Sequence, residues 1–122
     1  MKVRTQDLIE TALDWAVAKC EGYAATIKLT DVVYVHPNGE WHHNGNWIPS
    51  TNWAQGGPII GAIKGFEFKH WLESKPDTCC EAHIHNYEGD WIQFGPTQLI
   101  AALRCYVASK LGDEVDIPDE LV

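Results

Sequence analysis

Hydrophobic residues recur at helical spacing in two segments, one near each end of the chain. Residues 5–22 carry the first pattern, in which Thr5 is the expected N-terminal cap and Gly22 the expected stop. A second helix is predicted over residues 95–112, which begin with a glycine followed by Pro96 and end at another glycine. The apolar positions that define the two patterns are Leu8, Ile9, Ala12, Leu13, Ala16 and Val17 in the first, and Leu99, Ile100, Leu103, Val107 and Leu111 in the second.

Between these helices the pattern is typical of strands interrupted by one long polar segment. Residues 24–35 are rich in β-branched side chains, and residues 66–73 alternate between apolar and polar positions. Residues 80–87 and 90–94 predict a hairpin, whereas residues 36–58 contain two Asn-Gly turn signals and three tryptophans. The order of elements predicts an α+β fold, a small antiparallel β-sheet with an N-terminal and a C-terminal helix packed on it.

Acidic residues outnumber basic ones, and the excess is concentrated at the C-terminus. The chain of 122 residues has 17 acidic and 9 basic side chains, a formal net charge of −8. Residues 113–122 carry five of the acids and no base, so we expect a single domain over residues 1–112 followed by an acidic tail. No lysine- or arginine-rich run is present to neutralise the phosphates of a duplex, which argues against double-stranded nucleic acid as a partner.

The cysteines and the N-terminal residues indicate a reducing compartment. The N-terminal residues lack the apolar run of a signal peptide, and no stretch reaches the length of a membrane span. The four cysteines form a poor framework for disulfides, because Cys20 and Cys105 fall in predicted helices and Cys79 and Cys80 are adjacent. We therefore expect reduced thiols in a cytoplasm and no membrane partner.

The stretch STNWAQGGPII, residues 50–60, places a large ring beside two glycines. Trp53 could stack on a flat ligand, and the bare backbone of Gly56 and Gly57 could direct its N–H groups at an anion. In the alternative interpretation, Trp53 fills the core and the glycines form a tight turn before a short helix. The polar neighbours expected to read the edge of a ligand are Thr51, Asn52 and Gln55.

Further residues extend this predicted binding site. Trp47, or Trp41, would complete an aromatic platform, and Thr97 stands at a helix N-terminus, where backbone donors favour an anion. Arg104 would face the anion or, in the alternative, pair with an acid of the first helix. The predicted ligand-binding residues are therefore Trp47, Thr51, Asn52, Trp53, Gln55, Gly56, Gly57, Thr97 and Arg104.

Histidines and cysteines offer a weaker candidate, a metal site. His83 and His85 would project from one face of a strand, a spacing that zinc sites use, whereas Cys79 and Cys80 would point to opposite faces. The sequence has no CxxC, HExxH, phosphate-binding loop or nucleophile elbow. We therefore predict no metal, no cofactor and no catalytic residue. A metal-dependent hydrolase that uses His83 and His85 is one alternative.

Three blocks of the chain resemble the NinX family of tailed-phage proteins, a family of unknown function. They are ALDWAVAKCEG (12–22), STNWAQGGPII (50–60) and GPTQLIAALRCYVASKLGDEVDIP (95–118). The resemblance implies a phage accessory protein in the host bacterial cytoplasm, and it assigns neither a reaction nor catalytic residues.

The hypothesis that joins these observations is a non-enzymatic protein that evades a host defence. It would bind and sequester a small anionic, nucleotide-like signal such as a cyclic nucleotide or an ADP-ribose derivative. Because a domain of this length encloses such a ligand more readily at a subunit interface, a homo-oligomer is expected. The main alternative is an inhibitor of a host protein that docks through exposed aromatic side chains and the acidic tail.

Overall fold

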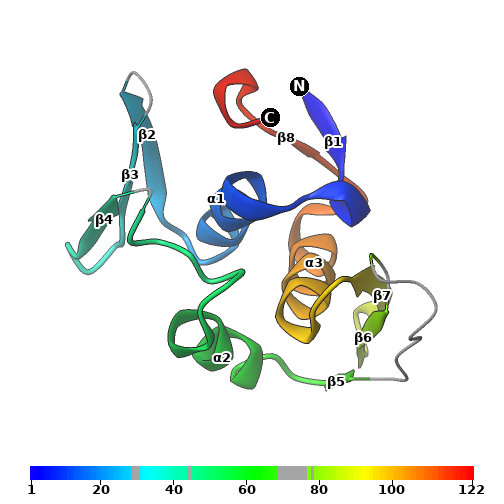
Figure 1. Ribbon diagram of the computed structural model, residues 1–122. Coiled ribbons are helices and arrows are strands. Elements are labelled where there is room, and N and C mark those ends of the chain that lie inside the picture. The colour runs from blue at the N-terminus through cyan, green and yellow to red at the C-terminus, as the bar shows by residue number, and fades with distance from the viewer. Residues whose placement is uncertain (29–30, 44, 69–76, 78) are drawn as a thin grey trace.

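A computed structural model describes residues 1–28, 31–43, 45–68, 77 and 79–122. This part of the chain contains three α-helices and three small antiparallel sheets, which confirms the predicted α+β class (Figure 1). The helices are α1 (Glu10–Cys20), α2 (Trp53–Gly61) and α3 (Gln98–Leu111), and short 3₁₀ turns η1 (Thr5–Asp7) and η3 (Asp119–Leu121) lie near the two ends. The sheets are β1 (Lys2–Arg4) with β8 (Glu114–Asp116), then β2 (Ala24–Lys28), β3 (Asp31–Val35) and β4 (Trp41–His43), and finally β5 (Phe66–Phe68), β6 (Cys80–Asn86) and β7 (Gly89–Gly95).

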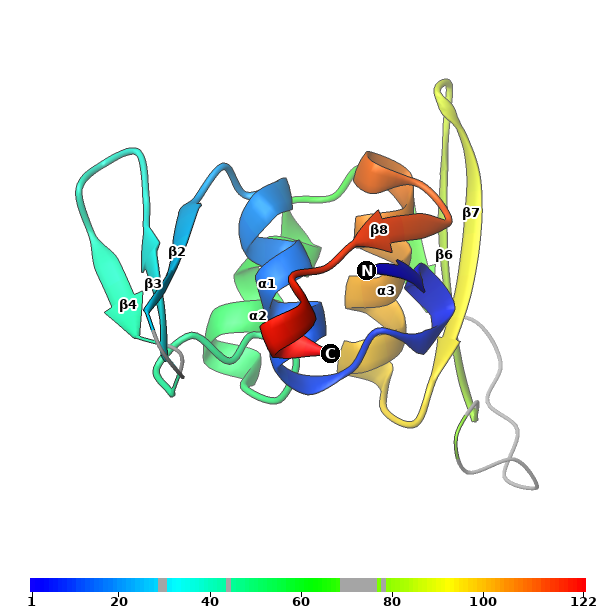
Figure 2. The ribbon, with the colours of Figure 1, turned by 90° about the horizontal axis from the view of Figure 1, so that it is seen from above.

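The helices occupy the middle of the molecule, with sheets on two sides. Figure 2 shows the β2–β3–β4 sheet beside α1 at one end and the β6–β7 hairpin beside α3 at the other. The β1–β8 pair lies next to the helices, close to both chain termini. The sequence pattern indicated one sheet, but the strands divide among three because the packed helices separate them.

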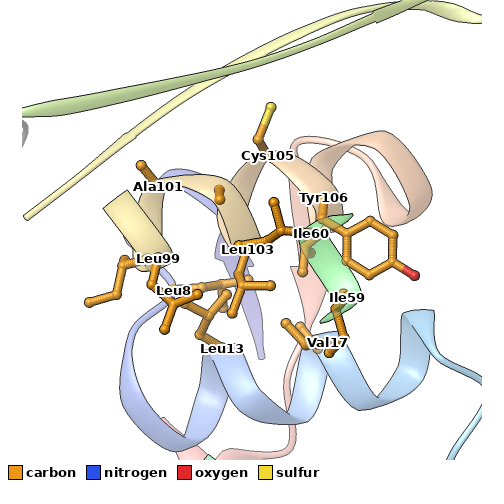
Figure 3. Close-up of a cluster of buried hydrophobic side chains, with 14 of the residues drawn as sticks. Leu8, Leu13, Val17, Ile59, Ile60, Leu99, Ala101, Leu103, Cys105 and Tyr106 are labelled. Carbon is orange, nitrogen blue, oxygen red and sulfur yellow. The ribbon is translucent and has the colours of Figure 1, made fainter. Parts of the chain in front are cut away.

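Helix α3 is the centre of the hydrophobic core. Every residue from Leu99 to Ala108 is buried. In Figure 3, Cys105 points toward the β-strands, whereas Leu103 and Tyr106 lie on the side of α1 and α2. A fully buried leucine or isoleucine side chain contributes roughly 1.5–3 kcal/mol relative to exposure, so a helix covered on all sides anchors the other elements.

The first helix begins later than the sequence indicated. Thr5 does not cap it, because α1 starts at Glu10 and Thr5 lies in η1. The Thr5 hydroxyl donates to the carbonyl oxygen of Gly112 at 2.6 Å, which joins the N-terminal segment to the end of α3. The two predicted glycine stops are confirmed, since Gly22 and Gly112 have φ values of +83° and +92° after α1 and α3.

The acidic C-terminal segment is part of the packed structure. Strand β8 pairs with β1 in the register Lys2 to Asp116 and Arg4 to Glu114. Val115 is 6% exposed and Ile117 is 1% exposed, so both belong to the core rather than to a tail beyond residue 112. Burial of Ile117 removes it from the apolar side chains that could dock a partner while the protein is folded.

The predicted strands agree with the structure wherever it describes them. The β6–β7 hairpin is confirmed, with Cys80 opposite Gly95 and Asn86 opposite Gly89. The polar segment 36–58 is more regular than indicated, because it contains β4 and the start of α2. Of the predicted strand 66–73, residues 66–68 form β5 and the remainder lies outside the described residues.

Candidate functional site

The tryptophan of the 50–60 stretch is accessible to solvent. Trp53 is the first residue of α2 and is 52% exposed, so the interpretation that it fills the core is wrong. A Cβ added at Gly57 would lie 3.7 Å from the Cε3 atom of Trp53, which places the ring against the surface of its own helix. Trp53 is therefore available for an interaction, and a Cβ at Gly57 would only make ordinary van der Waals contact with its ring.

The first glycine of this stretch, Gly56, serves helix packing. Gly56 lies inside α2, and its N–H donates to the carbonyl oxygen of Asn52 at 2.8 Å, so the helix uses the donor that was predicted for an anion. A Cβ at Gly56 would come within 2.4 Å of the Pro49 carbonyl oxygen and 2.7 Å of Leu99 Cδ1. The absent side chain lets the loop before α2 and the start of α3 approach α2 closely.

Most of the polar residues predicted to hydrogen-bond to a ligand form hydrogen bonds with nearby backbone groups instead. Asn52 caps α2 by accepting from the Ala54 N–H at 2.8 Å, and Thr97 caps α3 by accepting from the Ile100 N–H at 3.1 Å. Gln55 accepts from the Ile48 N–H at 2.8 Å and donates to the Asn46 carbonyl at 2.6 Å. The last member of the set, Thr51, is exposed.

Trp47 is a core residue rather than half of an aromatic platform. Its side chain is 5% exposed, its Nε1 donates to the carbonyl oxygen of Asp14 at 2.8 Å, and its ring centroid lies 4.7 Å from that of Tyr23. Trp41, the other proposed partner of Trp53, is 59% exposed on β4. Trp47 is therefore not part of the predicted aromatic platform. Its buried indole ring, with the N–H hydrogen-bonded, stabilises the contact between α1 and the loop before α2.

The carboxyl group of Asp14 is buried at the same junction. Asp14 is 4% exposed, and its Oδ1 accepts from the Ser50 N–H at 2.8 Å. Burial raises the pKa of Asp14 to about 6, although the bond from Ser50 opposes the shift.

Arg104 takes neither of its two predicted roles. It is 6% exposed, with Nε donating to the Leu8 carbonyl at 2.8 Å and Nη1 donating to the Phe94 carbonyl at 2.7 Å. Burial lowers the pKa of Arg104 from its usual range. The guanidinium therefore joins α3 to the segment after η1 and to β7, instead of facing Asp14 or a ligand beside α2.

A cavity of about 290 Å³ lies where the C-terminal ends of the three helices meet the tip of the β6–β7 hairpin. None of the predicted ligand-binding residues lines it. Glu21 follows α1, Ile59 and Lys64 come from the end of α2 and beyond, and Tyr106 comes from α3. These residues are far apart in the sequence and are brought together by helix packing.

A tyrosine–carboxylate pair forms one wall of the cavity. The Tyr106 hydroxyl donates to Oε2 of Glu21 at 2.5 Å. Burial, and then this bond, raises the pKa of Tyr106 above its ordinary value, so the phenol remains a donor at neutral pH. The pair orients the Glu21 carboxylate, and a carboxylate accepts several hydrogen bonds, so it can also receive donors from a ligand.

The other walls combine aromatic and cationic side chains. Trp91 is half-buried and stands opposite Ile84 in the hairpin register, and both line the cavity. Lys64 and Lys110 are exposed side chains of the lining, and Tyr87 at the hairpin tip is 96% exposed. The site thus has an aromatic and carboxylate interior, and its rim carries the exposed side chains of Lys64, Lys110 and Glu88, two positive charges and one negative.

The histidines do not form a metal centre with the residues that the structure describes. His83 and His85 share the outer face of β6 as predicted, but His83 pairs with Glu81 and His85 pairs with Asp90 of β7. Within the described ranges, no group of three or more His, Cys, Asp or Glu side chains is arranged to hold a metal ion.

Sequence reasoning missed the cavity because its residues carry no common motif. A partial signal was present in the hairpin, where Trp91 and Ile84 occupy inward positions and Tyr87 occupies a turn. The proximity of Glu21 to Tyr106 depends on the packing of α1 against α3, and no local pattern encodes that contact.

Comparison with known proteins identifies the family. Each helix in the described part of the chain is too short or too polar to cross a membrane, and no curated protein sequence matches the chain. A family model described as bacteriophage P22 NinX matches residues 4–110, which include α1, α2, all of α3 except its last residue, and the whole lining of the cavity. The chain therefore belongs to the bacteriophage P22 NinX family.

Proposed function

We propose that this phage protein binds and sequesters a single nucleotide in the cavity at the helix ends, without catalysis, and thereby acts against a host defence. The observation that carries the proposal is the cavity itself, with the Glu21–Tyr106 pair inside and Lys64 and Lys110 at the rim. Membership of a phage family supports a role in the infected cell.

The distribution of charge suits the two ends of a nucleotide. Helix C-termini carry partial negative charge, and three of them converge on the cavity beside Glu21. This interior favours N–H donors, such as the amino and imino groups on the edge of guanine, and disfavours a phosphate. The exposed ammonium groups of Lys64 and Lys110 are placed to receive the phosphate at the rim.

The size of the cavity selects the class of nucleotide. A volume of about 290 Å³ lies just below the usual range of small-molecule sites, which typically span about 300–1,000 Å³. A mononucleotide matches this volume, whereas a cyclic dinucleotide or ADP-ribose needs more space. The ring of Trp91 offers a surface for stacking on the base. The proposal therefore takes a smaller ligand held within one chain, whereas the sequence led us to expect a larger ligand held between subunits, and the panel of nucleotides below distinguishes the two.

Thermal denaturation in the presence of separate nucleotides tests the proposal. The panel contains GMP, AMP, CMP, UMP, a cyclic dinucleotide and ADP-ribose, each at several concentrations. A ligand present at a hundredfold excess over its Kd stabilises the protein by about 2.7 kcal/mol, which shifts the melting temperature by several degrees. We expect GMP to give the largest shift and the cyclic dinucleotide to give none.

Matched variants locate the binding site. Glu21→Gln keeps an acceptor for the Tyr106 hydroxyl but removes the charge that favours a donor edge, so it should reduce the preference for GMP. The double variant Lys64→Ala, Lys110→Ala should weaken the binding of GMP more than the binding of guanosine, which lacks the phosphate. The surface control Lys2→Ala should change the binding of neither compound. If no compound of the panel raises the melting temperature, or if the cavity variants respond like the wild type, the proposed function fails.

A further inference from the structure

The adjacent cysteines bring their sulfur atoms together at the start of β6. In a regular strand, consecutive side chains point to opposite faces. The sequence therefore predicted that the side chains of Cys79 and Cys80 would point away from each other. Cys79 precedes the first residue of β6, and the two Sγ atoms lie 3.5 Å apart. The prediction that these thiols diverge is therefore wrong, and they form a contact pair.

The surroundings of the pair leave one thiol accessible and cover the other. Cys79 is half-buried, and its Sγ lies 3.3 Å from the carbonyl oxygen of Pro96 and 3.9 Å from that of Gly95. Cys80 is 4% exposed. Because a disulfide bond is about 2.05 Å long, the sulfur atoms would need to approach by roughly 1.5 Å. Adjacent Cα atoms are about 3.8 Å apart across a trans peptide, closer than in most disulfides, so closure also requires a local adjustment of the backbone.

The other two cysteines differ from this pair. Cys20 and Cys105 lie in α1 and α3, and burial raises the pKa of each to about 12, so both stay protonated at neutral pH. The Cys105 thiol also donates to the carbonyl oxygen of Trp91 at 3.2 Å. Neither competes with Cys79 as a nucleophile.

We propose that Cys79 and Cys80 form a vicinal dithiol, a modification site that closes to a disulfide by exchange with a low-molecular-weight disulfide. In the first step, the Cys79 sulfur attacks one sulfur of the reagent, the Cys79–reagent bond forms, and the first reagent thiol leaves. In the second step, the Cys80 sulfur attacks Cys79, and the second reagent thiol leaves. The two protons of the dithiol leave with these thiols, and the two electrons that the dithiol loses reduce the reagent.

The order of attack follows from the environment of each thiol. Cys79 is half-buried and Cys80 is 4% exposed, so Cys79 reacts first with a reagent from solvent. Burial, and then the contact with Cys79, also raises the pKa of Cys80 to about 11. Once Cys79 carries the reagent, its neighbouring thiol no longer opposes ionisation of Cys80. The site lies at the opposite end of β6 from Asn86, which lines the cavity, so it does not depend on the proposed nucleotide binding.

Intact mass spectrometry after exposure of the folded protein to oxidised glutathione tests the proposal. The wild-type mass should fall by two hydrogens, the peptide that contains Cys79 and Cys80 should carry the bond, and dithiothreitol should reverse it. Cys80→Ser should stop at a glutathione adduct on Cys79, because the resolving thiol is absent. A Cys20→Ser, Cys105→Ser double variant should react like the wild type.

A trivalent arsenical supplies a second readout that requires no oxidation. Phenylarsine oxide condenses with two thiols and releases water, so the wild type should bind one equivalent and the Cys79→Ser variant should lose that binding. Circular dichroism checks that the serine variants are folded. A wild-type protein that remains unreactive, stops at a glutathione adduct or reacts at Cys20 or Cys105 would overturn the proposal.

Discussion

Replacement of Asp14 by asparagine should make the protein more stable at neutral pH. The Asp14 carboxyl group is 4% exposed, and its Oδ1 accepts a hydrogen bond from the Ser50 N–H at 2.8 Å. An asparagine Oδ1 can accept the same bond without carrying a charge. Asp14→Asn therefore removes a buried charge while it keeps the link between α1 and the loop before α2.

The magnitude follows from the pKa of Asp14. Its value in the folded state is about 6, compared with 3.8 for an unperturbed aspartate, a rise of about two units. Each unit corresponds to about 1.4 kcal/mol, so ionised Asp14 costs the folded state about 3 kcal/mol. Between about pH 4 and pH 6, the folded protein retains a proton that the unfolded chain has released. The contribution of Asp14 to stability is therefore complete below about pH 4 and is lost as the pH rises through 6.

Urea denaturation of both proteins between pH 4.5 and 7.5 measures this effect. The free energy of unfolding of Asp14→Asn should exceed that of the wild type by about 3 kcal/mol at pH 7.5, and the difference should narrow to about 1 kcal/mol at pH 4.5. The other carboxyl groups are the same in both proteins, so their titration cancels when the free energy of unfolding of the wild type is subtracted from that of the variant. Asp113→Asn, at an exposed acid, is the control and should change stability by less than about 0.5 kcal/mol. A less stable Asp14→Asn protein at pH 7.5 would refute the argument.

Three further substitutions test the packing, each by chemical denaturation. Gly56→Ala should destabilise the protein by about 1–3 kcal/mol, because the new methyl would lie 2.4 Å from the Pro49 carbonyl oxygen; an unchanged midpoint would contradict this. Ile117→Ala should cost about 2–5 kcal/mol, since Ile117 is 1% exposed, and a near-neutral result would indicate that the C-terminal segment is a dispensable tail. Trp53→Ala should change stability by less than about 0.5 kcal/mol because its ring is 52% exposed, whereas a loss of several kcal/mol would mean that the ring packs in solution.

The local elements of the fold were predictable because periodicity and turn residues act over short distances. The positions of Gly22 and Gly112 indicated where α1 and α3 end, and the alternation of residues 80–94 indicated the β6–β7 hairpin. The start of α1 was missed because the Thr5 hydroxyl bonds to the Gly112 carbonyl, a partner distant in sequence.

The candidate site was misplaced because polar and aromatic side chains have more than one use. Trp47, Gln55 and Arg104 have the chemistry of ligand-binding residues, but each meets backbone groups of this protein instead. Which use prevails depends on whether a carbonyl or amide from another segment arrives within hydrogen-bond distance, and the sequence of the residue's own segment does not contain that information.

The sequence by itself determined the α+β class, the ends of α1 and α3, the β6–β7 hairpin and the resemblance to a phage family. Only the tertiary structure decided that the helix ends and the hairpin enclose a cavity, that Ile117 is a core residue, and that the thiols of Cys79 and Cys80 touch. The physical reason is range: helix and strand formation depend on neighbours a few residues apart, whereas cavities, buried charges and side-chain pairs depend on segments that meet only when the chain packs.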